Sequence, residues 1–166
     1  DVSVPNEQKL LKKLKNNHLS IATDVAYVFP ENGTRVLKHR PVIIGSGPAG
    51  LFCGYLLAQH GYRPIIIERG RCVEQRQKDV EAFWKTNVLD IHSNVQFGEG
   101  GAGTFSDGKL NTLVKDVKGR NKKVLDIFIF HGAPEKISYM NKPHIGTDIL
   151  MKVVADMRNQ IKVWGG

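Results

Sequence analysis

Two runs of consecutive apolar residues, Val42–Ile44 and Ile65–Ile67, stand out in a chain that otherwise mixes polar and apolar positions. A continuous run of β-branched residues is typical of a parallel strand buried on both faces, whereas a half-exposed strand alternates. Between the two runs, an apolar segment follows a group of glycines and ends near Gly61, a residue type that favours helix termination. The pattern therefore predicts a buried strand, a helix and a second buried strand.

Four further segments carry apolar residues at helical spacing, and each predicts a helix. They cover residues 6–15, 71–86, 124–131 and 147–161. Asn6 is the expected cap of the first helix, and Thr147 or Asp148 is the expected cap of the last. In the second helix, we expect the aromatic pair Phe83 and Trp84 to lie in the core.

The first 40 residues differ from the rest, and we interpret them as a separate N-terminal leader segment. After the first predicted helix, apolar and polar positions alternate from Ile21 through Thr23 to Phe29, and a turn at 30–33 follows. This pattern indicates a hairpin that returns over residues 34–38. Residues 41–166 then form one domain, because 166 residues at 41% hydrophobic content can build a single core.

The glycines after the first strand have the spacing of a phosphate-binding turn, GxGxxG. The first glycine of such a turn permits a tight bend, the second lets the backbone approach a pyrophosphate, and the third lets helix and strand pack closely. The anion then lies at the helix N-terminus, where unpaired N–H groups and the helix dipole attract it. The candidate cofactor-binding residues in this turn are Gly45, Ser46, Gly47, Pro48, Ala49 and Gly50.

An acid, Glu68, ends the second strand 23 residues after Gly45. A carboxylate at this place accepts hydrogen bonds from ribose hydroxyls and disfavours a 2′-phosphate, which argues against NADP. Strand, turn, helix, strand and acid together predict an α/β fold with a Rossmann βαβ unit that binds an adenine dinucleotide. Gly54 lets the helix pack tightly against the sheet and shifts the prediction from NAD toward FAD.

A second glycine-rich stretch runs from Gly98 to Gly108, where five of eleven residues are glycine. This composition is incompatible with a helix interior or an ordinary strand. Phe97, Phe105 and the polar residues among them favour a loop shaped against a ligand over a mobile surface loop, because a backbone without Cβ atoms can lie along a flavin or its pyrophosphate. Its candidate cofactor contacts are Gly100, Gly101, Ser106 and Lys109. For His144, a hydrogen-bonded loop position is favoured over a contact with substrate.

The two glycine-rich stretches together resemble the uncharacterised FAD-dependent dehydrogenase family of bacteria, also described as NAD(FAD)-utilising dehydrogenases. The matching segments are Gly45–Leu51, Glu68–Gly70, Ser93–Leu110 and Lys142–Asp148. The resemblance implies FAD held by the first turn, by Glu68 and Arg69, and by the 98–109 loop. It also implies an oxidoreductase whose flavin carries the hydride or electrons, with NAD(P)H as a candidate electron donor and an unknown small-molecule substrate.

In that family, a double glycine such as Gly165–Gly166 introduces a further strand and then the remaining flavin and substrate domains. The resemblance therefore implies that these 166 residues are an N-terminal portion whose Rossmann sheet is incomplete. We expect such a portion to hold FAD weakly or not at all and to be inactive by itself.

The formal charge of +8 is spread along the chain, and the basic run 115–123 has no interleaved aromatic residue, so it is interpreted as a solvated loop. A nucleic-acid partner is therefore not favoured. Cys53 and Cys72 have no CxxC or histidine partners, which argues against a metal site or disulfide framework and favours a reducing cytoplasm. Cys53 is expected to be a small buried residue. With no apolar run near eighteen residues, no membrane partner is expected.

Two alternatives stay open at this point. The net positive charge would also suit a flavin- or nucleotide-dependent module that modifies or binds RNA. The glycine turn and the acid would equally suit an NAD-dependent dehydrogenase without flavin.

Overall fold

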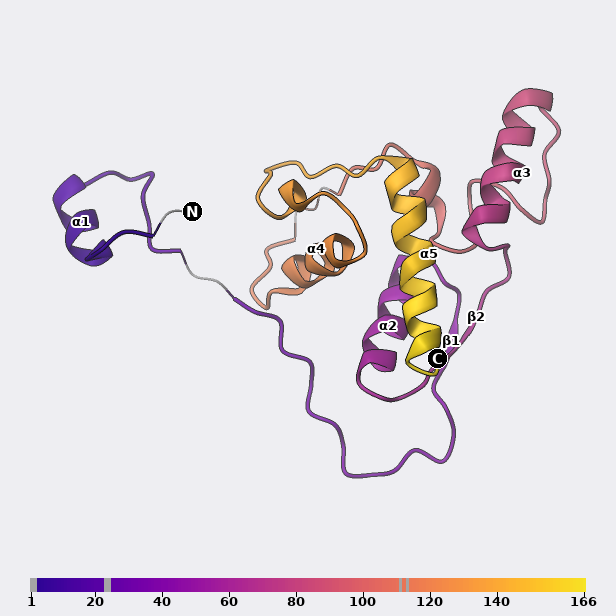
Figure 1. The fold of residues 1–166 in the computed structure, drawn as a ribbon, viewed down its shortest axis with the longest axis horizontal. Helices are drawn as coiled ribbons and strands as arrows, with labels where there is room; N and C mark the ends of the chain where they lie inside the picture. Colours follow the sequence, from indigo (N-terminus) through magenta and orange to yellow (C-terminus); the bar gives the residue numbers. More distant parts are fainter. Residues whose placement is uncertain (1–2, 23–24, 111, 113) are drawn as a thin grey trace.

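A small parallel sheet and two helices packed beside each other form the centre of the molecule (Figure 1). The computed structural model describes residues 3–22, 25–110, 112 and 114–166. The central elements are β1 (Val42–Ile44), α2 (Pro48–Gln59), β2 (Ile65–Ile67) and α5 (Thr147–Val163). The others are α1 (Glu7–Leu14), α3 (Val73–Thr86), α4 (Arg120–Phe130) and the 3-10 helices η1 (Ala102–Phe105) and η2 (Glu135–Ser138).

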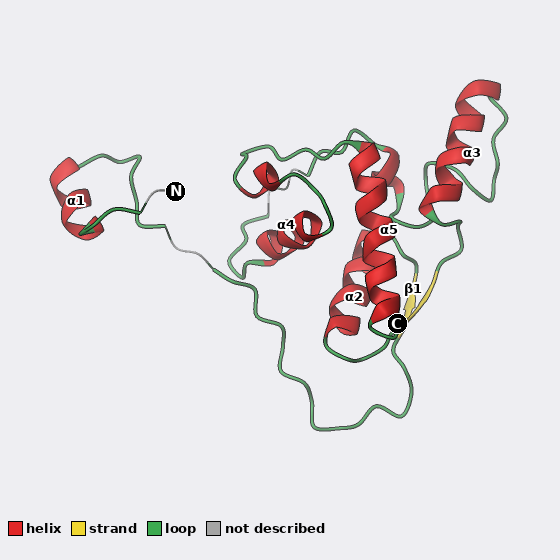
Figure 2. Ribbon diagram, viewed as in Figure 1, coloured by secondary structure: helices red, strands yellow, loops and turns green. Residues whose placement is uncertain are grey.

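The predicted strand–helix–strand unit is confirmed. β1 and β2 pair in parallel with Ile43 opposite Ile66, and α2 connects them across one face of the sheet (Figure 2). Gly54 explains how closely the helix approaches, since a Cβ atom there would lie 2.4 Å from Cδ1 of Ile66. The absence of a side chain at this position therefore allows α2 to sit directly on the two isoleucines.

The prediction that both faces of the strands are buried is wrong. The pleat alternates the side chains, so Ile43 and Ile66 point toward α2 while their neighbours point away. Val42 is 57% exposed and Ile44 is 79% exposed, because no described element covers the second face of the sheet. Only one side of this unit contributes to the core.

The hydrophobic core lies between α2, α4, η2 and α5. Helix α5 packs along α2, and its predicted apolar face is confirmed by five buried residues: Leu150, Val153, Val154, Met157 and Ile161. Tyr55 of α2 and Ile137 of η2 complete the same cluster. At the end of α5, the Arg40 side chain donates to the carbonyls of Arg63, Pro64 and Gly165. This clamp holds the end of α5 beside the start of β2.

Helix α4 begins four residues before the predicted start at residue 124. The carboxylate of Asp116 accepts hydrogen bonds from the backbone N–H groups of Arg120 and Asn121, at 2.7 Å each. These contacts satisfy first-turn donors that would otherwise lack partners. An acid outside the helix therefore sets its start, a signal that apolar spacing does not contain.

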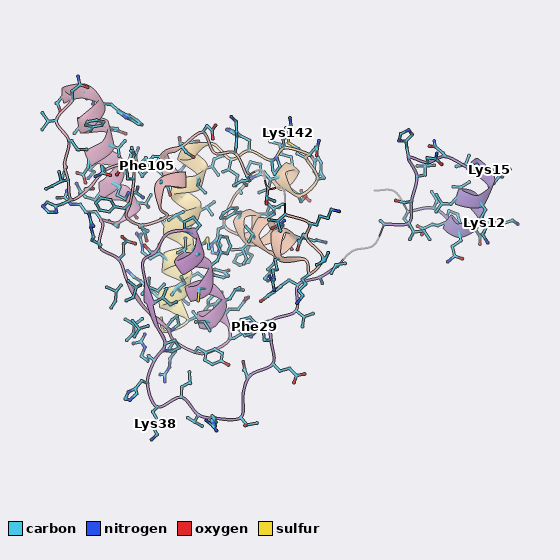
Figure 3. The ribbon with its side chains drawn as sticks, turned by 180° about the vertical axis from the view of Figure 1, so that it is seen from behind. Lys12, Lys15, Phe29, Lys38, Phe105 and Lys142 are labelled. Carbon is cyan, nitrogen blue, oxygen red and sulfur yellow. The ribbon has the colours of Figure 1, made fainter. Side chains whose placement is uncertain are left out.

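The predicted hairpin in the leader is wrong for the described residues. Residues 25–38 form no strand and no β-bridge, and Thr23 lies outside the described residues. Instead the segment passes the C-terminal end of α2, where the ring of Phe29 stacks on His60 at 3.7 Å between ring centroids. An isolated two-stranded hairpin is marginally stable in water. Helix α1 does form, with Leu14 exposed, and Figure 3 shows it far from the core.

Several side-chain predictions are also corrected. Trp84 is 62% exposed because the second half of α3 extends beyond α5 (Figure 1). Cys53 is exposed because it lies on the side of α2 opposite the buried Leu51 and Gly54. The expected side-chain caps are not made either, since the residue before α5 is Gly146 and Asn6 makes no side-chain cap hydrogen bond. Among the described residues, no helix has the length and apolar content needed to cross a membrane.

Candidate functional site

Two glycines of the first turn have structural reasons inside the protein. Gly45 has φ of +91°, a left-handed conformation that L side chains rarely adopt, so the bend after β1 requires glycine. A Cβ atom on Gly50 would lie 2.0 Å from the carbonyl oxygen of Gly45. This contact is the close packing of helix on strand that the spacing predicted.

At Gly47, neither the backbone conformation nor a close contact requires glycine. Its φ of −64° is accessible to any residue, and a Cβ atom there would have no atom of the described residues within 4 Å. The space beside Gly47 is open. Since no contact among the described residues requires glycine here, the position fits the close approach of a ligand from outside.

The N-terminus of α2 presents unused hydrogen-bond donors next to this open space. No loop carbonyl or side chain among the described residues accepts from the backbone N–H groups of Gly47, Ala49 or Gly50. Pro48, the first residue of the helix, has no N–H group to leave unpaired. First-turn amides and the helix dipole together favour an anion such as a phosphate.

Glu68 lies directly beside the turn. Its carboxylate accepts hydrogen bonds from the Ser46 N–H group at 2.6 Å, the Ser46 hydroxyl at 3.0 Å and the Gly70 N–H group at 2.8 Å. Burial acts to raise the pKa of Glu68, but the hydrogen bonds from Ser46 and Gly70 outweigh it and lower the pKa. The side chain is therefore an ionised acceptor at neutral pH, as recognition of a ribose requires.

The second glycine-rich stretch packs against the first. The N–H group of Gly100 donates to the carbonyl of Ser46 at 2.8 Å, and a Cβ atom on Gly101 would lie 2.9 Å from Cδ of Pro48. Gly100 and Gly101 both have positive φ, at +80° and +72°. The two stretches, whose contacting residues lie more than 50 positions apart in sequence, thus form one continuous surface at the carboxyl ends of the strands.

The loop also meets the acid-bearing end of β2. A Cβ atom on Gly70 would lie 2.4 Å from Cα of Gly98, so the two backbones touch. The guanidinium of Arg69 lies over the Phe97 ring, 4.2 Å from its centroid. Arg69, predicted as a cofactor contact, therefore has a protein partner on the loop.

Ser106 and Lys109 lie at the other end of the loop. The Ser106 hydroxyl donates to the carbonyl of Gly103, and the Lys109 ammonium pairs with Asp107 at 2.8 Å, both on the exposed surface. Lys109 also forms a β-bridge with His144, which is exposed and adjacent to Gly108. This end of the loop forms a separate region that does not line the cavity beside Glu68.

A cavity of about 510 Å³ adjoins the acid. It runs along the edge of β2 between the strand and α5, and its lining includes Ser46, Glu68, Gly70, Cys72, Glu99 and Arg158. One end of the cavity therefore reaches Glu68, and the other end lies among Arg40, Ile65 and Lys162. Its size is in the range of cavities that hold small molecules.

Arg158 of α5 organises the wall of this cavity. It donates to Glu74 at 2.6 Å and to Glu99 at 2.7 Å. The hydrogen bond from Arg158 lowers the pKa of Glu74 to about 2. Burial raises the pKa of Glu99, although its bonds to Val73 and Arg158 act in the opposite direction. One arginine thus holds an exposed carboxylate whose pKa is lowered and a buried carboxylate whose pKa is raised.

Sequence reasoning missed two residues of this region, Arg76 and Arg158. Both sit on helices that the apolar spacing predicted, but both are charged residues, a type that is mostly exposed. The signal that could have found Arg76 is its place between Val73 and Val80, on the buried face of α3. Among the described residues, no cluster of acidic, histidine or cysteine side chains could hold a metal ion.

Comparison with known proteins agrees with this geometry. A family model described as an NAD(P)-binding Rossmann-like domain matches residues 43–85, which include most of β1, all of α2 and β2, and most of α3. A protein of Clostridium beijerinckii, described as uncharacterised, is 46% identical over 166 residues. The match covers all of this chain and 31% of the relative's length. Residues 43–85 therefore form a Rossmann-like nucleotide-binding unit of the kind typical of oxidoreductases.

Proposed function

We propose that this site binds the ADP part of FAD and that the protein carrying it is a FAD-dependent oxidoreductase. The observation that carries the proposal is the contact between the two glycine-rich stretches, in which the Gly100 N–H group donates to Ser46. A simple phosphate-binding turn does not need a second glycine-rich loop against it. A long dinucleotide with a flavin beyond its pyrophosphate gives that loop something to lie along.

Each part of the ligand has a group of this chain that fits it. The open space at Gly47 and the free amides of Ala49 and Gly50 suit the pyrophosphate. The ionised carboxylate of Glu68 suits the ribose hydroxyls and disfavours a 2′-phosphate. Bound flavin would supply the redox chemistry, and the residues described here would bind and orient it.

The test is identification of the cofactor in the natural full-length protein that carries this sequence. Heat or acid releases a non-covalent cofactor, which absorbance and mass then identify. We expect FAD at close to one per chain. Recovery of NAD, or of no nucleotide at all together with no ADP binding, would contradict the proposal.

A NAD-dependent dehydrogenase is the second candidate, because the family model that matches residues 43–85 is described as NAD(P)-binding. Its turn and acid would be used in the same way, with the nicotinamide in place of the flavin. The same extraction distinguishes the two, since the oxidised flavin absorbs visible light and the nicotinamide does not.

A further inference from the structure

Arg76 is fully buried, although arginine is almost never buried without a partner of opposite charge. Its side chain leaves α3 and enters the loop of residues 94–101. There Nη1 donates to the carbonyls of Glu99 at 2.6 Å and Gly101 at 3.0 Å, and Nη2 donates to the carbonyls of Asn94 at 3.1 Å and Val95 at 3.3 Å. All four acceptors in this described region are backbone carbonyls.

The loop is wound around this guanidinium. A Cβ atom on Gly98 would lie 2.5 Å from Cδ of Arg76, so glycine is needed where the backbone passes the side chain. The ring of Phe105 also packs on the guanidinium, with its centroid 4.8 Å from Cζ of Arg76. Figure 3 shows Phe105 where η1 passes between α3 and α5. A planar fork with two donor nitrogens can serve four carbonyls, whereas the single nitrogen of lysine cannot.

The same stretch of backbone contacts the phosphate turn on its other side. Gly100 donates to Ser46, and Gly101 packs against Pro48, while the carbonyls of Glu99 and Gly101 are held inward by Arg76. A loop that lost these four anchors would shift against the turn. The guanidinium stays charged at all physiological pH values, and that charge already interacts with the carboxylates of Glu68 and Glu99. Any effect of Arg76 on the turn therefore passes through the loop that it anchors.

We propose that Arg76 is the positioning residue for the pyrophosphate: it fixes loop 94–101 against residues 46–48, without touching the ligand. This inference rests on the proposed function of the site. It assigns a binding role to a residue outside both glycine-rich stretches.

The test compares ADP with adenosine, which lacks the phosphates, in the natural full-length protein freed of cofactor. Arg76→Lys keeps the charge but loses the fork. Lys78→Gln is the matched control, because it removes a charge from an exposed position on the same helix.

The binding of ADP and of adenosine is measured by calorimetry. We expect Arg76→Lys to weaken ADP binding by about tenfold, because a shift of the loop against the turn would cost the phosphate about one hydrogen bond. Adenosine binding stays unchanged in Arg76→Lys, and Lys78→Gln behaves as the parent protein.

A milder variant covers the case in which Arg76→Lys folds poorly. Phe105→Leu leaves the four hydrogen bonds in place but loosens the packing on the guanidinium, so it weakens ADP binding selectively and to a smaller extent. Equal losses for ADP and adenosine in both variants would assign Arg76 a general structural role and overturn the inference. Parent-like ADP binding in both would overturn it too. Failure of the parent protein to bind ADP would remove the proposed function itself, and this inference with it.

Discussion

Gly47 and Gly50 lie three residues apart in one turn, and the structure predicts opposite consequences for replacing each by alanine. At Gly47, the backbone conformation suits alanine and the new methyl group meets no protein atom within 4 Å. At Gly50, the methyl group would lie 2.0 Å from the Gly45 carbonyl oxygen and 3.3 Å from Cγ2 of Ile43. Gly47→Ala should therefore affect the ligand alone, and Gly50→Ala should affect the fold.

The magnitudes follow from these contacts. Replacing glycine by alanine at a compatible position stabilises a protein by about 0.4–1 kcal/mol through the unfolded state. Alanine is a poorer N-cap than glycine, which offsets part of this gain, so Gly47→Ala should change the free energy of unfolding by less than about 0.5 kcal/mol. Gly50→Ala should cost about 1–3 kcal/mol, as overpacking does, because a backbone carbonyl must move.

For ADP affinity we expect the reverse order, with a direct effect of Gly47→Ala on the bound ligand. A methyl group at Gly47 occupies the open space in front of the Ala49 and Gly50 amides, and displacing a phosphate from one such charged hydrogen bond costs about 1.5–3 kcal/mol, or roughly 10- to 150-fold in affinity. Urea unfolding and ADP calorimetry on the natural full-length protein measure both quantities. If Gly47→Ala bound ADP as the parent protein does, the phosphate would not lie at this turn.

Three further predictions test other parts of the site. Glu68→Gln should weaken ADP binding about tenfold, because a neutral amide replaces the charged acceptor of the ribose hydroxyls. Glu81→Gln on the exposed surface of α3 is the control. Equal ADP affinities of the Glu68→Gln and Glu81→Gln variants would disprove the role of Glu68. Maleimide should label both exposed cysteines, Cys53 and Cys72. ADP should slow the labelling of Cys72, which lines the cavity, and should leave the labelling rate of Cys53 on the far side of α2 unchanged. Equal protection of both thiols would indicate a global change instead. The lowered pKa of Glu74 stabilises the fold above pH 4.5, and that contribution is lost as the pH falls toward 2. Because Glu74 is 54% exposed, the loss is about 1 kcal/mol or less, and Glu74→Gln should make the acid limb of urea unfolding shallower; an unchanged limb would show that the Arg158 pair contributes nothing.

The βαβ unit was predictable from sequence because its signals are local. The glycine spacing, the apolar runs and Glu68 lie within 27 residues, and each reflects a backbone requirement that one residue type satisfies. Gly45 needs positive φ and Gly50 needs the absence of Cβ, so those two assignments followed from chemistry alone. The apolar face of α5 was predictable for the same reason, since helical spacing states which side chains turn inward.

What sequence reasoning could not predict depends on contacts between distant segments. The exposure of Ile44 is decided by whether anything covers the second face of the sheet, and a run of isoleucines contains no such information. Trp84 was misplaced because helical spacing gives a direction around the helix axis but not how far the neighbouring helix extends. The start of α4 depended on Asp116, which reaches the helix from outside its apolar pattern.

For the loop of residues 98–108, the sequence predicted that the backbone is constrained but not which residues constrain it. Its glycines indicated a constrained backbone, and positive φ at Gly98, Gly100 and Gly101 bears this out. Their constraint, however, comes from an arginine on α3 and from the phosphate turn, both distant in sequence. Because Arg76 fills the inside of the loop and Ser46 and Pro48 contact its outer side, Gly98, Gly100 and Gly101 have a reason within the protein, which is to place the loop against the phosphate turn. Within the two glycine-rich stretches, Gly47 and Gly103 have neither a positive φ nor a described neighbour within 4 Å, so contact with a dinucleotide is best sought along the surface that includes them.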